Sequence, residues 1–219
     1  MYTKELMEIH TARLSRFHGM KWWLQDEVYG PKNIPRFWRE LNEFCWIVYS
    51  KAFMSSGMAY LGRIGDIQQI RRNICQMPAS GSGLLSEHAK GNALSLPKWA
   101  PLLNDSWVLG HIHRKASFTN ISPFSPANLW EDSESRVGCT VTARELIGLI
   151  NFGYVFENGI YNCKNPVLAQ AADLIKYNEI MMREERKGMK SIMIFISINH
   201  DLREAIRSFD RNTLKYVHI

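Results

Sequence analysis

The chain has 219 residues, 46% of them apolar and 22% charged, with 27 Lys and Arg against 21 Asp and Glu. This composition excludes wholesale disorder, because a chain of this length can bury about 70% of its unfolded surface. The net charge of +6 is spread along the chain without a dense basic block, so nucleic-acid binding is not expected. No membrane span is predicted, and we expect a protein that is cytoplasmic as synthesised, or secreted without a cleavable signal peptide.

The first third of the chain predicts a helical layer. Residues 3–16 carry apolar side chains at helical spacing, and Thr3 is placed to cap the helix. A stronger helix begins at Pro35 and runs to about Met54, because apolar residues recur every three or four positions while Arg and Glu face away. A shorter helix is expected over residues 64–75.

A change of composition marks a boundary within the chain. Residues 78–101 are rich in glycine, serine and proline and have little periodicity, which is typical of a long loop or linker. We therefore predict a single domain over residues 1–219. A soft internal boundary would separate a helical part (1–77) from an α+β part (102–219).

Beyond this boundary the pattern becomes mixed. Short strands are predicted at 107–113 and 117–121, and the alternating isoleucines of residues 191–198 predict a central strand. The remaining predicted elements are helices over 143–152 (capped by Thr142, ended by Gly153), 166–187 (ended by Gly188) and 200–209, and an edge strand over 214–219. The expected class is α+β, with an N-terminal helical layer packed on a small, mainly antiparallel sheet.

The sharpest local feature is Gly110-His111-Ile112-His113-Arg114, at the end of the first predicted strand. Strand alternation would put His111 and His113 on the same face, where two imidazoles could meet one metal ion or one substrate phosphate. Two histidines at this spacing could equally supply one catalytic base.

The four cysteines form no Cys-x-x-Cys pair and are expected to be reduced thiols. Cys139 and Cys163 both stand just before a predicted helix, where the amides and the helix dipole favour the thiolate form. Cys45 lies on the apolar face of a predicted helix and is expected in the core.

A histidine-bearing strand followed by a cysteine that opens a helix resembles the layout of circularly permuted papain-like hydrolases, the NlpC/P60 superfamily. The resemblance covers residues 107–170. It implies a base, a nucleophile and a group that orients the imidazole, which would be His111 or His113, Cys163 or Cys139, and Asn120 or Asn128. It also implies hydrolysis of an amide in a peptide or peptidoglycan crosslink by a bacterial effector or toxin, with a cognate immunity or carrier protein as partner.

Two other enzyme classes remain open on the same histidines. The Gly-His-Ile-His run resembles the last metal-binding signature of the calcineurin-like metallophosphoesterases, which implies a metal-dependent nuclease or phosphoesterase. The order of His113-Arg114, Thr119 and a later helix and strand resembles an ADP-ribosyltransferase core, which implies an NAD-dependent toxin with Glu204 as its late carboxylate. The main prediction requires neither a metal ion nor another cofactor.

The seven tryptophans suggest a further role in binding. Trp99 and Trp130 lie in predicted loops that flank the histidine segment, where they could bind substrate together with Arg114. Tryptophans also anchor protein interfaces. A non-enzymatic protein-binding module therefore remains the alternative from a different functional class.

Overall fold

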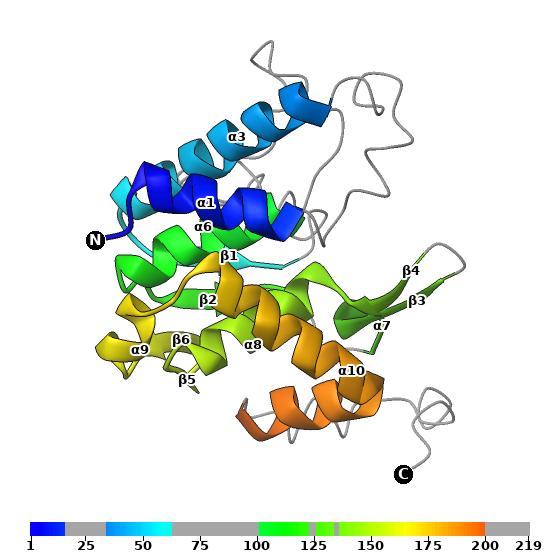
Figure 1. Cartoon of the computed structure of the whole chain (residues 1–219). Coiled ribbons are helices and arrows are strands. Elements are labelled where there is room, and N and C mark those ends of the chain that lie inside the picture. Colours follow the sequence, from blue (N-terminus) through cyan, green and yellow to red (C-terminus); the bar gives the residue numbers. More distant parts are fainter. Residues whose placement is uncertain (16–33, 63–100, 123–125, 134–135, 200–219) are drawn as a thin grey trace, which may run out of the picture.

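The structure is a computed structural model, and it describes residues 1–15, 34–62, 101–122, 126–133 and 136–199 (Figure 1). Within these ranges, seven helices accompany a four-stranded sheet and a two-stranded hairpin, which confirms the α+β class. No helix in the described part of the chain is long and apolar enough to cross a membrane. The elements predicted at 64–75, 200–209 and 214–219 lie outside the described residues, as does the loop predicted at 78–101 except for Pro101, which begins a helix.

The N-terminal helical layer is confirmed. It contains α1 (Lys4–Ser15) and α3 (Ile34–Met54), and α3 packs along α6 (Pro101–His113) (Figure 1). Leu41, Phe44 and Val48 are buried at helical spacing on α3, and Cys45 lies in the core as predicted. Gly110 permits the close approach of α6, since a Cβ there would lie 2.5 Å from the Tyr49 carbonyl oxygen.

Helix α6 replaces the strand predicted over residues 107–113, so that prediction was wrong. Every residue from Leu102 to His113 is buried, including the polar ones. A helix that is buried all round shows no amphipathic period, and its apolar run cannot be distinguished from a central strand by pattern alone.

The main sheet has the order β1-β2-β6-β5 and is mainly antiparallel, as expected. Its strands are β1 (Ala59–Leu61), β2 (Phe118–Asn120), β5 (Tyr154–Glu157) and β6 (Ile160–Cys163). The pair β1–β2 is parallel. Asn158 and Gly159, with φ of 52° and 83°, form the two-residue turn between β5 and β6.

A separate hairpin precedes the central helix. Helix α7 (Pro126–Leu129) leads into β3 (Trp130–Ser133) and β4 (Arg136–Cys139), and then into α8 (Val141–Asn151). Thr140 caps α8 in place of the predicted Thr142, because its Oγ1 accepts a hydrogen bond from the Ala143 amide at 3.2 Å. Gly153 follows α8 with a φ of 86°, in agreement with the prediction.

The last described elements are helical and correct two predictions. The helix predicted over 166–187 is divided into α9 (Pro166–Gln170) and α10 (Leu174–Asn199), and α10 breaks at Gly188, where φ is 81° and ψ is 173°. The central strand predicted over 191–198 is instead the part of α10 beyond this break. Ile192 and Ile196 are buried four residues apart, so tertiary packing overrides the β-propensity of the segment.

Candidate functional site

The two predicted catalytic histidines lie on different sides of α6. Helical geometry separates positions i and i+2 by about 200° around the axis. His111 faces the sheet, where its ring lies 5.8 Å from that of Phe118 on β2, and it also contacts Trp107, one turn earlier on α6, at 4.4 Å. His113 faces the N-terminal helices. The prediction that both imidazoles share one face was therefore wrong, because it assumed a strand.

His113 is bound within the core through both ring nitrogens. Its Nε2 lies 3.0 Å from the Ala172 carbonyl oxygen, which can only accept, so Nε2 carries the hydrogen. The Tyr49 hydroxyl then donates to Nδ1 at 2.8 Å, and the ring of Tyr2 packs beside the imidazole at 5.1 Å. Burial lowers the pKa of His113, and the hydrogen bond to Ala172 opposes this only in part. The side chain ties α6 to α3 and to the loop before α10.

His111 is held as a neutral imidazole. The Arg114 Nε donates to its Nδ1 at 3.0 Å, so the hydrogen of the neutral ring resides on Nε2. Burial, reinforced by the Arg114 charge, lowers the pKa of His111 to about 3. Its Nε2 is buried and has no hydrogen-bond partner among the described residues. In this state His111 can donate a hydrogen bond, but it is not arranged to take up a proton.

Arg114 joins the C-terminal ends of two helices. Besides His111, its guanidinium donates to the carbonyl oxygens of Ala52 at 3.1 Å and Gly57 at 2.8 Å. A cation beside the last carbonyls of α3 is favourable for the helix dipole and satisfies groups that the helix leaves unbonded. The side chain predicted to bind substrate is thus engaged in a contact between α6 and α3.

Cys163 stands at the end of β6, directly opposite Tyr154 of β5. The Tyr154 ring contacts Phe118, which contacts His111, so Cys163 and His111 lie at the same end of the inner sheet face with two rings between them. Burial raises the pKa of the Cys163 thiol, while the charge of Lys115 and the Asn165 amide lower it. Asn165 caps α9 by accepting from the Leu168 amide at 3.1 Å.

The remaining predicted residues lie elsewhere. Cys139 is fully buried in the hairpin opposite the half-buried Trp130, and its amide donates to Glu185 Oε1 at 3.1 Å. Asn120 ends β2 and donates through Nδ2 to the Ser122 carbonyl at 2.9 Å. The Asn128 carbonyl accepts from the Thr140 hydroxyl at 2.5 Å. Trp99 lies outside the described residues. The structure thus brings together His111 and Arg114, and it places Cys163 two aromatic rings away from His111. His113, Cys139 and Trp130 lie apart from these residues.

A buried polar cluster that joins α6, α8 and α10 was not predicted from the sequence. Asp105 of α6 and Arg144 of α8 form a two-pronged ion pair, with nitrogen–oxygen distances of 2.9 and 2.8 Å. Their side chains are 1% and 8% exposed. The guanidinium lies 5.7 Å from the ring centroid of Tyr177 on α10, whose hydroxyl donates to the Arg144 carbonyl at 3.0 Å. The cluster joins three helices.

Glu145 follows Arg144 and is also buried, with 5% of its surface exposed. Burial raises the pKa of Glu145 to about 8, the neighbouring Asn104 opposes the rise in part, and the negative charge of Asp105 adds to it. Glu145 Oε2 has no hydrogen-bond partner among the described residues. A carboxyl group in this setting is held protonated at neutral pH. The available sequence signal was a charged pair, Arg144-Glu145, inside an otherwise apolar helix.

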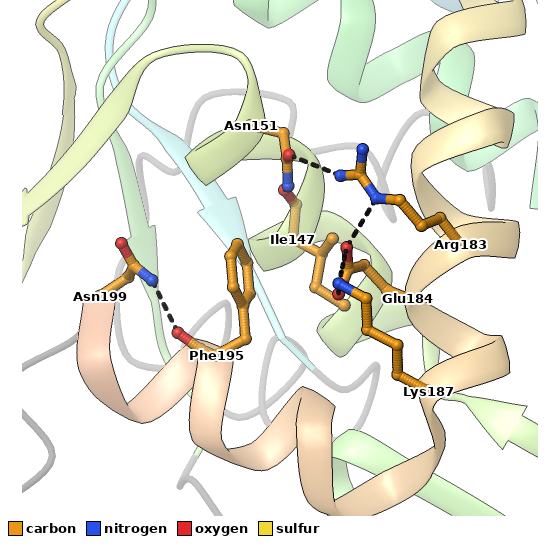
Figure 2. Close-up of polar contacts among 7 residues, drawn as sticks. All are labelled: Ile147, Asn151, Arg183, Glu184, Lys187, Phe195 and Asn199. Carbon is orange, nitrogen blue, oxygen red and sulfur yellow. Dashed lines mark hydrogen bonds and ion pairs between the residues drawn. The ribbon is translucent and has the colours of Figure 1, made fainter.

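A second charged cluster holds the other end of α8 to α10, as Figure 2 shows. Glu184 is buried and accepts from Lys187 at 2.9 Å through both carboxylate oxygens, and from Arg183 at 3.0 Å. Arg183 also donates to Asn151 Oδ1 at 3.2 Å. Burial opposes ionisation of Glu184, but these two cations outweigh it, so its pKa is lowered.

Neither cluster resembles a metal centre. Across the described ranges, no group of three or more His, Cys, Asp and Glu side chains is arranged to hold a metal ion. No protein-family model, curated protein or solved structure matches this chain. The candidate residues are two neutral histidines, the buried Arg144 guanidinium paired with Asp105, and the partly exposed Cys163 thiol.

Proposed function

We propose that this protein acts by binding a partner protein through the β3–β4 hairpin, with Trp130 as the anchor. Trp130 pairs with Cys139, and Asp132 pairs with Val137. Cross-strand partners point to the same face, so Trp130, Asp132 and Val137 line one side of the hairpin. At its base, Trp130 is half-buried against the core, whereas Val137 is 67% exposed. Figure 1 shows the hairpin extending away from the helices.

The hairpin presents the exposed Val137 beside the half-buried Trp130 on one side. The Trp130 ring is already held against the core, so a partner that covers it and Val137 buries apolar area with little loss of side-chain entropy. The predicted catalytic residues support the same reading. His113 is bonded through both nitrogens, His111 has a pKa of about 3, and Cys139 is fully buried. These side chains stabilise the core that holds the hairpin.

Site-specific photo-crosslinking in the producing cell tests the proposal. A photoreactive amino acid replaces Val137, and in a matched control it replaces Val167 on α9, which is 77% exposed. We expect one discrete protein adduct from position 137 and none from position 167. Trp130→Ala in the position-137 protein should remove the adduct, and His111→Gln should not. Equal adducts at both positions, or none at position 137, would contradict the proposal.

One observation favours a second candidate function, Cys–His amide hydrolysis by a bacterial effector that cleaves peptide or peptidoglycan crosslinks. Of the cysteines in the described ranges, Cys45 and Cys139 are buried and Cys163 is partly exposed. Burial raises the pKa of its thiol overall, and Lys115 and the Asn165 amide oppose this by favouring the thiolate form. In this mechanism the Cys163 thiolate attacks the amide carbonyl, the C–N bond breaks as the leaving amine takes a proton from water, and a second water hydrolyses the thioester.

Thiol labelling distinguishes the two functions. A hydrolase nucleophile at Cys163 should react with iodoacetamide at neutral pH faster than an unstructured cysteine peptide, and Lys115→Gln should slow the reaction. A thiol whose pKa is raised should react more slowly than the peptide. Growth of cells that direct the protein to the cytoplasm or to the periplasm gives the functional control. Toxicity that disappears with Cys163→Ala but persists with Trp130→Ala would favour hydrolysis.

A further inference from the structure

The last segment of α10, residues 189–199, has one apolar side that is buried and a second apolar side that is exposed. Ile192 and Ile196 are fully buried on the side that packs on the protein. Figure 2 shows this segment beyond the break, with the Phe195 ring directed toward the end of α8. The opposite side carries Ile194 and Ile198, which are 47% and 76% exposed.

The two exposed isoleucines lie on the same side of the helix as Lys190. Lys190, Ile194 and Ile198 are spaced four residues apart, so they lie along one stripe of the helix, and all three are exposed. We name these three residues the outer stripe. Arg186 is also exposed, but it precedes the Gly188 break and does not belong to this stripe.

Among the described residues, the cations near the start of the outer stripe differ in whether a carboxylate pairs with them. Arg183 and Lys187 both pair with Glu184. Within the described part of the chain, no carboxylate pairs with Lys190 or Arg186. The chain as a whole carries a net charge of +6. A partner for the outer stripe must therefore offer negative charge next to apolar surface.

We propose that the outer stripe binds the surface of an anionic phospholipid bilayer. The helix lies in the plane of the surface, with Ile194 and Ile198 in the boundary between headgroups and acyl chains. The Lys190 stem lies along the apolar layer while its ammonium group reaches the lipid phosphates. Arg186 adds attraction to the negative surface. This interaction uses an element other than the β3–β4 hairpin and does not depend on the hairpin function.

Charge argues against a second copy of this chain as the occupant. Two outer stripes packed face to face would bring two Lys190 side chains into one interface. Like charges in an interface are repulsive unless counter-charges accompany them. An anionic headgroup layer supplies that counter-charge at every position along its surface.

Sedimentation with lipid vesicles tests the proposal on the full chain. We expect the protein to sediment with phosphatidylcholine vesicles that contain phosphatidylglycerol, to remain in solution with pure phosphatidylcholine, and to be released as salt is raised. Ile194→Ser with Ile198→Ser should weaken binding by about tenfold or more, since burial of each isoleucine contributes to the affinity. Lys190→Gln with Arg186→Gln should weaken it and remove most of the salt dependence.

Val167→Ser is the matched control, because it removes an equally exposed apolar side chain from α9 and should leave binding unchanged. Circular dichroism of each variant checks that α10 is still folded. Failure of the wild type to bind anionic vesicles would overturn the proposal, as would a double isoleucine variant that binds as the wild type does. A concentration-dependent dimer lost with Ile194→Ser, without vesicle binding, would identify a second copy as the occupant and overturn it too.

Discussion

Two charged clusters hold α8 in place, and they differ in how much water they retain. In the core cluster, the Asp105 and Arg144 side chains are 1% and 8% exposed. In the outer cluster, Glu184 is 3% exposed, but its partners Arg183 and Lys187 are 56% and 48% exposed. A half-exposed cation stays hydrated when its partner is removed. The buried Arg144 guanidinium instead relies on Asp105 to accept its hydrogen bonds in place of water. Similar ion-pair distances therefore correspond to very different contributions to stability.

The largest expected effect follows from breaking the core pair. Arg144→Ala leaves Asp105 buried without its counter-charge and removes the group that packs on Tyr177. We expect the free energy of unfolding to fall by about 3 to 5 kcal/mol, measured by urea denaturation. Asp105→Ala should have a similar effect, and the double variant should lose far less than the sum of the two. A loss below about 1 kcal/mol for Arg144→Ala would show that solvent reaches the pair.

A smaller and pH-dependent effect is expected at Glu145, beside this pair. Its pKa is raised from 4.5 to about 8, so the folded state holds a proton that the unfolded state releases. Stability should be highest below the unfolded pKa, decrease as pH rises toward 8, and level off above it. Because each pKa unit corresponds to about 1.4 kcal/mol, the decrease between pH 5 and pH 9 should be up to about 4 kcal/mol.

Glu145→Gln provides the matched control for this pH dependence. The amide keeps the size of the side chain and cannot ionise, so the variant should lose most of the decrease and be more stable than the wild type at pH 9. Urea denaturation at pH 5, 7 and 9 measures both proteins. Parallel pH profiles would mean that Glu145 titrates near its ordinary pKa and is accessible to water.

The smallest effect is expected in the outer cluster. Lys187→Ala leaves Glu184 with its bond from Arg183, and water can replace the lost ammonium group. We expect a loss of less than about 1 kcal/mol, and still less at high salt. Thermal unfolding in low and high salt measures it. If Lys187→Ala were as destabilising as Arg144→Ala, exposure would not be the property that separates the two clusters.

The predictable parts of the fold are the elements with one buried side and one exposed side, because their apolar residues then repeat at a regular spacing. Helix α3 is buried on one side only, and Leu41, Phe44 and Val48 therefore repeat at helical spacing. Strand β2 was also predicted within one residue at each end. In contrast, α6 and the end of α10 were predicted as strands. One is buried all round, and the other places isoleucines on both its buried and its exposed sides.

Predictions for the candidate site succeeded or failed with the secondary structure on which they were based. The pairing of His111 with His113 followed from strand alternation and failed with the strand. Cys163 comes within two aromatic rings of His111 because β5 and β6, which are distant in sequence, join the sheet beside β2. No local spacing could have indicated it. The Asp105–Arg144 pair was missed for the same reason, since charged residues on two helices reveal a partner only when the helices are packed.

By itself, the sequence determined the α+β class, the amphipathic helices α1 and α3, the core position of Cys45, and the stops at Gly153 and Gly188. These features depend on composition, periodicity and backbone freedom, which are local properties. Tertiary structure decided that α6 is a helix and that both of its histidines are neutral. It also made one ion pair a core element, because burial and pairing arise only when distant segments meet and exclude water.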